Sequence, residues 1–170
     1  MGYTHYFEQK REFSAKEWMD LAFDANQLFE ASPVRLGNGL GEPGSVPEIA
    51  DEYIRFNGVE PDDYETFEIR AEGGGGFCKT GFSEICRYDL IVKAVLIAAY
   101  NTAPDAIEVS SDGFDFEWED ALAFANENIP GSLRMPPSIR RNAGFTPEYR
   151  SGELYEQVKA EYIQNKASRR

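Results

Sequence analysis

The chain contains a single histidine, His5, and two cysteines, Cys78 and Cys86. Because histidine gains and loses a proton near neutral pH, any histidine-dependent step must use His5. With Cys78 it would form a nucleophile–base pair, so an enzyme that uses these two residues is one alternative. A cysteine that follows an aromatic residue is more typical of a small buried hydrophobe, and a histidine among aromatic strand residues is more typical of a structural group. A protein without catalytic activity is therefore favoured.

A second candidate site follows the run of glycines from Gly73 to Gly76, where Lys79 and Thr80 come next. A lysine beside hydroxyl groups and a glycine-rich loop can bind an anion. The glycine that should directly precede the lysine is missing, so the phosphate-loop motif of nucleotide-binding enzymes is not met. The segment predicts contacts with a nucleotide-like anion or, as the simpler alternative, the turn of a hairpin.

The run from Ser110 to Gly113 leads from a predicted strand into a helix. Backbone N–H groups at such a junction can hold an anion or ribose hydroxyls, although serine, aspartate and glycine are also what an ordinary junction requires. A further polar residue, Asn57, lies at a predicted turn. The predicted ligand-binding set is His5, Asn57, Lys79, Thr80, Ser110, Ser111 and Asp112.

No metal or cofactor is predicted. The two cysteines are eight residues apart without a second pair, so a four-ligand zinc motif is absent and a disulfide framework is not expected. The carboxylates of Asp62, Asp63 and Glu65 do not have the spacing of a calcium-binding loop and are typical of a solvated turn. The longest apolar stretch, residues 90–100, contains Lys93 and is too short to span a bilayer, and no signal peptide is recognisable. We expect a cytosolic protein that does not enter the membrane.

Strands and helices that would position these residues follow in the order β-α-β-β-α-β. Ser14 and Glu17 form a capping box that predicts the start of the first helix, which should end near Ser32. Asp89 is expected to cap the second, almost entirely apolar helix. The predicted elements are strands at residues 3–7, 53–56, 65–70 and 107–109, and helices at residues 14–32 and 89–100.

This order predicts an α+β fold, a ferredoxin-like split βαβ sandwich with both helices on one face of a four-stranded antiparallel sheet. A third helix at residues 117–128 and a C-terminal helical tail are added to it. In such a sheet the first strand lies between the third and the fourth. His5, Lys79 and Asp112 are therefore predicted to approach one another on or beside the sheet.

Charge divides the chain at residue 130. Residues 1–130 hold 9 Lys and Arg against 26 Asp and Glu, whereas residues 131–170 hold 8 against 4. We expect an acidic α+β domain at residues 1–130, then a basic connector and an amphipathic helix that begins at Ser151. This helix would dock on its own acidic body or, as the alternative, on a partner. An acidic body repels nucleic-acid phosphates, so direct nucleic-acid binding is disfavoured. The charge suits a basic protein surface, although acidic surfaces also simply keep proteins in solution.

Several short segments resemble a group of uncharacterised proteins encoded by tailed bacteriophages and prophages, and the resemblance covers about residues 1–113. They are Met-Gly-Tyr-Thr-His-Tyr at the start, Phe56-Asn57-Gly58, Glu65-Thr66-Phe67, Phe77-Cys78-Lys79-Thr80, Tyr88-Asp89 and Val109-Ser110-Ser111-Asp112-Gly113. Many members of that group have tryptophan where this chain has Phe7. The resemblance transfers no catalytic residue. It implies an accessory protein in the bacterial cytosol that binds and inhibits a host or defence component, with capture of a nucleotide-like ligand as the alternative.

Overall fold

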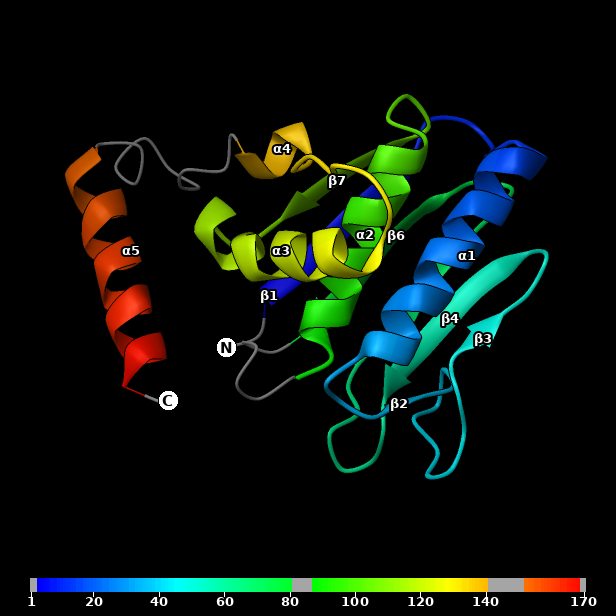
Figure 1. Ribbon diagram of the computed structural model, residues 1–170, viewed down its shortest axis with the longest axis horizontal. Coiled ribbons are helices and arrows are strands. Elements are labelled where there is room, and N and C mark those ends of the chain that lie inside the picture. Colours follow the sequence, from blue (N-terminus) through cyan, green and yellow to red (C-terminus); the bar gives the residue numbers. More distant parts are fainter. Residues whose placement is uncertain (1–2, 81–86, 141–151, 169–170) are drawn as a thin grey trace.

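The computed structural model describes residues 3–80, 87–140 and 152–168, and it confirms a mixed α+β protein with antiparallel sheets (Figure 1). Predictions for Cys86 and Ser151 lie outside these residues. In chain order the elements are β1 (Tyr3–Gln9), α1 (Ala15–Ala31), β2 (Leu36–Gly37), β3 (Glu48–Ile49), β4 (Tyr53–Gly58), β5 (Phe67–Arg70), β6 (Gly75–Thr80), α2 (Asp89–Thr102), β7 (Ile107–Ser111), the 3₁₀ helix η1 (Asp115–Trp118), α3 (Glu119–Asn128), α4 (Pro137–Arg140) and α5 (Gly152–Ala167).

Helix α1 begins as the sequence predicts. The hydroxyl of Ser14 accepts a hydrogen bond from the Glu17 amide at 3.2 Å, and the Glu17 carboxylate accepts one from the Ser14 amide at 2.8 Å. The helix ends at Ser32, directly before a proline. Its buried face consists of Trp18, Leu21, Ala25 and Leu28.

Helix α2 is the centre of the hydrophobic core. It packs against α1 on one side and α3 on another, and all residues from 91 to 99 are buried (Figure 1). The predicted role of Asp89 as its N-cap is wrong. Tyr88 occupies the cap position without a side-chain cap hydrogen bond, and Asp89 is the first residue of the helix. The side chain of Asp89 points inward because it has partners on the sheet, described below.

The sheets match the predicted strand order in part. β1 lies beside β7 and is antiparallel to it, as predicted for the first and fourth strands. Its other antiparallel neighbour is β6, which was not predicted as a strand, whereas the predicted third strand at residues 65–70 corresponds to β5 and pairs with β4. β4 pairs with β2, β3 and β5 in a second sheet. The described strands therefore form two sheets rather than the expected single sheet of four strands, and the ferredoxin-like topology stays a prediction.

The glycine run joins β5 to β6: Gly73 and Gly74 lie in the connection, and Gly75 and Gly76 begin β6. Gly73 and Gly74 have φ values of +109° and +116°, a backbone conformation that residues other than glycine rarely adopt. Gly76 lies against the ring of Phe7, where an added Cβ would come within 2.5 Å of a ring carbon. Positive φ values and a close aromatic contact thus account for three of these glycines. The expected hairpin is not found among the described strands, because β5 pairs with β4 and β6 pairs with β1.

The C-terminal part contacts the acidic body. Met135 and Ile139 belong to the hydrophobic core, so the core extends past residue 130. In α5, the ring of Tyr162 lies 5.2 Å from that of Phe116, and Lys166 forms an ion pair with Asp120. These contacts agree with the predicted docking of the tail helix on its own domain. None of the described helices is long and apolar enough to cross a membrane.

Candidate functional site

The three strands around β1 bring several of the predicted residues together on one face. The strand register places His5 opposite Cys78 of β6 and opposite Ser111 of β7. Opposed residues of antiparallel strands share a face, and so do residues two apart, which adds Thr80 to the group. All four side chains are buried.

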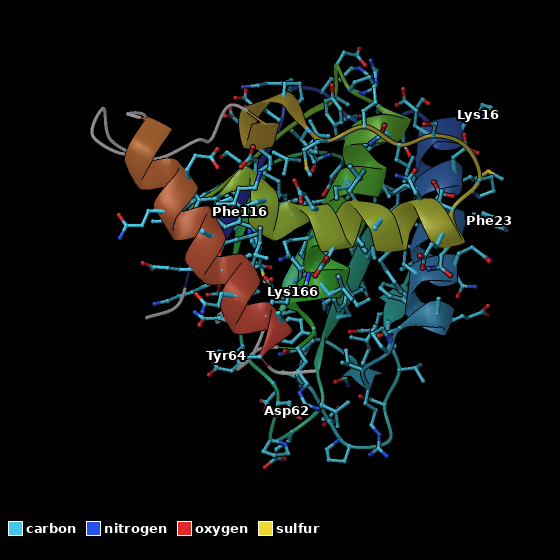
Figure 2. The ribbon with its side chains drawn as sticks, turned by 60° about the vertical axis from the view of Figure 1, so that its left-hand side comes forward. Lys16, Phe23, Asp62, Tyr64, Phe116 and Lys166 are labelled. Carbon is cyan, nitrogen blue, oxygen red and sulfur yellow. The ribbon has the colours of Figure 1, made fainter. Side chains whose placement is uncertain are left out.

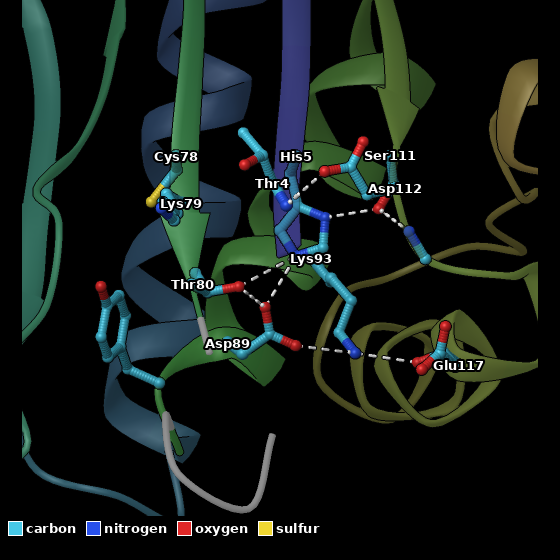
Figure 3. A network of polar contacts seen from close by, with 12 residues as sticks. Thr4, His5, Cys78, Lys79, Thr80, Asp89, Lys93, Ser111, Asp112 and Glu117 are labelled. Atoms are coloured by element: carbon cyan, nitrogen blue, oxygen red, sulfur yellow. Dashed lines mark hydrogen bonds and ion pairs between the residues drawn. The ribbon is translucent and has the colours of Figure 1, made fainter. Parts of the chain in front are cut away.

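His5 is bonded through both ring nitrogens. Nδ1 lies 2.8 Å from Ser111 Oγ, and Nε2 lies 2.6 Å from Asp89 Oδ1 (Figure 3). Because the carboxylate only accepts, Nε2 donates to Asp89, while Nδ1 and the serine hydroxyl share the second hydrogen bond. The Ser111 oxygen in turn accepts the Gly113 amide at 2.9 Å. The result is a continuous Ser–His–Asp chain of hydrogen bonds.

Asp89 also binds two groups besides the histidine. Its Oδ1 accepts from the Thr80 hydroxyl at 2.5 Å, and its Oδ2 lies 2.9 Å from Lys93 Nζ. Lys93 then donates to the backbone carbonyl of Glu117 at 2.8 Å, which connects α2 to η1. Burial alone would raise the pKa of Asp89, but the Lys93 charge and the bonds from His5 and Thr80 hold it well below its usual range. We call His5, Thr80, Asp89, Lys93 and Ser111 the His5 cluster.

Residues of η1 close the cluster. The ring of Trp118 meets the His5 imidazole edge-on, with centroids 5.0 Å apart, and is itself fully buried. The Glu117 carboxylate accepts the Phe114 amide at 2.6 Å, and burial raises the pKa of this carboxyl group. The first contact places η1 against the sheet, and the second closes the start of η1 itself.

A Ser–His–Asp chain is the arrangement that activates a serine nucleophile in hydrolases, where the serine oxygen must reach the substrate. Here Ser111 is only 6% exposed, and its oxygen already contacts His5 and Gly113. The geometry instead links β1, β6 and β7 to α2 through buried, mutually satisfied polar groups. In this conformation the cluster serves the fold.

The remaining sheet residues of the predicted set lie elsewhere. Lys79 pairs with Thr4 and Ser110 with Tyr6, so both point to the opposite face of the sheet from His5. The Asp112 carboxylate accepts the Thr4 amide at 3.1 Å at the end of the strands. Lys79 therefore faces away from His5, whereas Asp112 lies at the strand end beside Thr4, the neighbour of His5 (Figure 3).

Asn57 organises the loops at the end of β4. Its side-chain amide donates to the carbonyls of Gly39 and Tyr64 at 3.2 and 2.8 Å. Its carbonyl oxygen accepts the amides of Gly58 and Tyr64 at 2.8 and 3.0 Å. Every polar atom of this side chain is thus occupied by backbone. A ligand-binding role for the predicted set stays a prediction, and for its buried members it would require the core to open.

Asp89, Lys93 and Trp118 are the members of this site that the sequence interpretation missed. A signal for the first two was present: an acidic and a basic residue four apart in an otherwise apolar helix lie on the same helical face and can pair. Nothing local marks Trp118, because its contact with His5 depends on how η1 folds back on the sheet.

The surface carries a groove between α1 and the ends of α2 and α3, with a volume of about 400 Å³. We call it the α1 groove. Its walls are Asp20, Phe23, Asp24, Asn101, Thr102, Ile129, Pro130 and Leu133. The wall after α3 is fixed: Asn101 exchanges hydrogen bonds of 2.8 and 2.9 Å with the backbone of Arg134, and Asn126 accepts the Leu133 amide at 2.8 Å.

Asp24 is the unusual residue of the α1 groove. Within the described parts of the chain it makes no hydrogen bond or ion pair, whereas Asp20 pairs with Lys16 at 2.6 Å. Burial, and secondarily the charge of Asp20, raises the pKa of Asp24 to about 6. Phe23, which also lines the groove, is 58% exposed, and Met19, one turn before Phe23 on α1, is 71% exposed. Figure 2 shows Phe23 on the outside of α1, close to the end of α3.

Comparisons of the chain with protein-family models, with curated proteins and with solved structures gave no match. Among the described residues, no group of three or more His, Cys, Asp and Glu side chains is placed to hold a metal ion. The function must therefore be inferred from the His5 cluster and the α1 groove themselves.

Proposed function

We propose that this protein acts by binding another protein: it captures a basic protein of a bacterial host, and thereby inhibits it, without catalysing a reaction. One observation carries the proposal. The side chains able to do chemistry are buried and paired in the His5 cluster, whereas the α1 groove holds an unpaired carboxylate beside exposed apolar residues.

The burial of the nucleophile candidates supports the absence of catalysis. Cys78 and His5 are fully buried, and they lie on the face of the sheet that packs against α2. A nucleophile and its base must reach the substrate to act. A thiol enzyme built on Cys78 and His5 would need a route through the core, so a binding function agrees better with the geometry.

The surface supports a protein partner. Met19 and Phe23 are exposed on the same side of α1, next to the carboxylates of Asp20 and Asp24. Exposed aromatic and methionine side chains commonly anchor protein interfaces. With a net charge of −13, the chain favours basic partners. The resemblance to phage proteins suggests that the partner is bacterial.

The proposal is tested by immobilising the full chain and passing a bacterial lysate over it at low salt. We expect retained proteins that are basic and that elute as NaCl rises, because the attraction between exposed charges is screened. An unrelated protein of equal net charge on the same resin is the control. Retention that ignores salt, or the same proteins on the control resin, would contradict the proposal.

A further inference from the structure

We propose that the α1 groove binds an arginine side chain of the partner protein, held by the carboxylates of Asp20 and Asp24 and by the ring of Phe23. This inference rests on the proposed function and names the site where the partner docks. It is carried by the charge, the shape and the incomplete pairing of the groove.

Several sources of negative charge surround the groove. Asp24 contributes a carboxylate from α1 that is unpaired among the described residues, and Asp20 contributes one that already pairs with Lys16 at 2.6 Å. Thr102 is the last residue of α2 and Ile129 directly follows α3, so the C-terminal ends of both helices also line it. A helix C-terminus carries a partial negative charge, and neither helix has a basic residue in its last turn to offset it. The groove therefore favours a cation.

The apolar walls select the kind of cation. Phe23 exposes its ring at the edge of the groove, and Pro130 and Leu133 form the opposite wall. An arginine guanidinium can stack on an aromatic ring and pair with carboxylates through two parallel hydrogen bonds, while its stem packs on apolar surface. A lysine offers only a point charge, and a metal ion would leave the apolar walls unused.

The groove is already ordered, and Asp24 is already partly desolvated, before the partner binds. The hydrogen bonds between Asn101 and Arg134 fix the wall, so little chain has to be ordered. Asp24 is half removed from water and lacks a cation among the described residues, as its raised pKa reflects. A guanidinium placed there gains the attraction without the full cost of desolvating the carboxylate.

The test measures binding of a tri-arginine peptide to the full chain by calorimetry at low salt, with tri-lysine and tri-citrulline peptides for comparison. Citrulline keeps the shape of arginine but not its charge. We expect tri-arginine to bind more tightly than tri-lysine and tri-citrulline to show no binding. Asp24→Asn should weaken tri-arginine binding by about tenfold, the scale of a partly buried charge pair. Phe23→Ala should weaken it by a few-fold.

Asp62→Asn is the matched control. It removes the same charge from an exposed loop away from Phe23 (Figure 2), so it should change the affinity by less than about twofold. Equal weakening by Asp24→Asn and Asp62→Asn would overturn the proposal, because only net charge would then matter. So would equal binding of tri-citrulline, or of tri-lysine. Self-association that Asp24→Asn abolishes would identify the occupant as a second copy of the chain and overturn it as well.

The pH dependence gives a readout that a structural role would not move. Among the described residues, Asp20 is the only other titratable side chain that lines the groove, and it pairs with Lys16. The single histidine is buried in the core. Affinity for tri-arginine should therefore fall as pH drops through about 6 in the original chain and stay flat in Asp24→Asn. If the lysate experiment succeeds with the Asp24→Asn chain as well, the proposed function stands and this site fails.

Discussion

Asp89 in the His5 cluster and Asp24 in the α1 groove are the same residue type, both withdrawn from water, yet their pKa values move in opposite directions. The pKa of Asp89 lies well below the ordinary value because Lys93, His5 and Thr80 stabilise the carboxylate. The pKa of Asp24 rises to about 6 because its charge is desolvated and faces only the like charge of Asp20. What differs is the set of partners, not burial alone.

This difference in partners decides which of the two carboxylates is available for binding. The chain itself completes the pairing of Asp89, which therefore stabilises the fold and offers nothing to a ligand. Within the described residues the chain does not complete the pairing of Asp24, which leaves a site that a partner's cation would complete.

The largest effect is expected from Asp89→Asn. It should lower the free energy of unfolding at pH 7 by about 3–5 kcal/mol, because the buried Lys93 loses its carboxylate. Urea denaturation measures this. Since the folded-state pKa of Asp89 is depressed, its contribution is present above the ordinary value of 3.8 and is lost as pH falls below it. The two proteins should therefore converge in strong acid, and a loss under about 1 kcal/mol at pH 7 would contradict a structural role for the cluster.

A smaller loss is expected from Ser111→Ala. Removing the hydroxyl leaves His5 Nδ1 without its serine partner and the Gly113 amide without its serine acceptor, which should cost about 1–3 kcal/mol. The neighbouring Ser110→Ala lies on the other face of the sheet and should stay within about 0.5 kcal/mol of the original. Thermal unfolding of both variants measures the contrast. Equal effects would show that the inner face is not special.

Asp24→Asn is expected to stabilise the protein, by about 1 kcal/mol above pH 6 once solvent screening is allowed for. The raised pKa means that ionisation of Asp24 opposes folding. The gain should therefore be present above pH 6 and vanish as pH falls towards 3.8, where aspartate is protonated in both states. Urea denaturation at several pH values checks this. A variant that is both more stable and a weaker binder marks a residue kept for function, and a destabilised variant would contradict that view.

Local patterns predicted much of the fold. The capping box located the start of α1, and the strand order placed β1 beside β7. The other neighbour of β1, β6, was not predicted as a strand. The same topology correctly brought His5 next to Ser111. It wrongly placed Lys79 beside His5. Lys79 lies opposite Thr4, and successive residues of a strand point to opposite faces, so Lys79 and His5 are on different faces of the sheet.

The rest depended on contacts between distant segments. Asp89 was predicted as a helix cap because Asp is a common N-cap residue, but its partners on the sheet are many residues away. The α1 groove is formed by residues 20–24, 101–102 and 129–133, so no local pattern marks it. Asp24 looks in the sequence like any exposed helix carboxylate. Its altered pKa arises only once these three segments pack together.

The most direct test of the claim that function lies in the groove rather than in the cluster is an amide-resolved NMR titration of the full chain with tri-arginine. The account predicts shifts concentrated at Asp24, Asn101 and Leu133, with the amides of His5 and Ser111 unchanged. Shifts centred on His5 and Ser111, or spread evenly over the acidic surface, would contradict it.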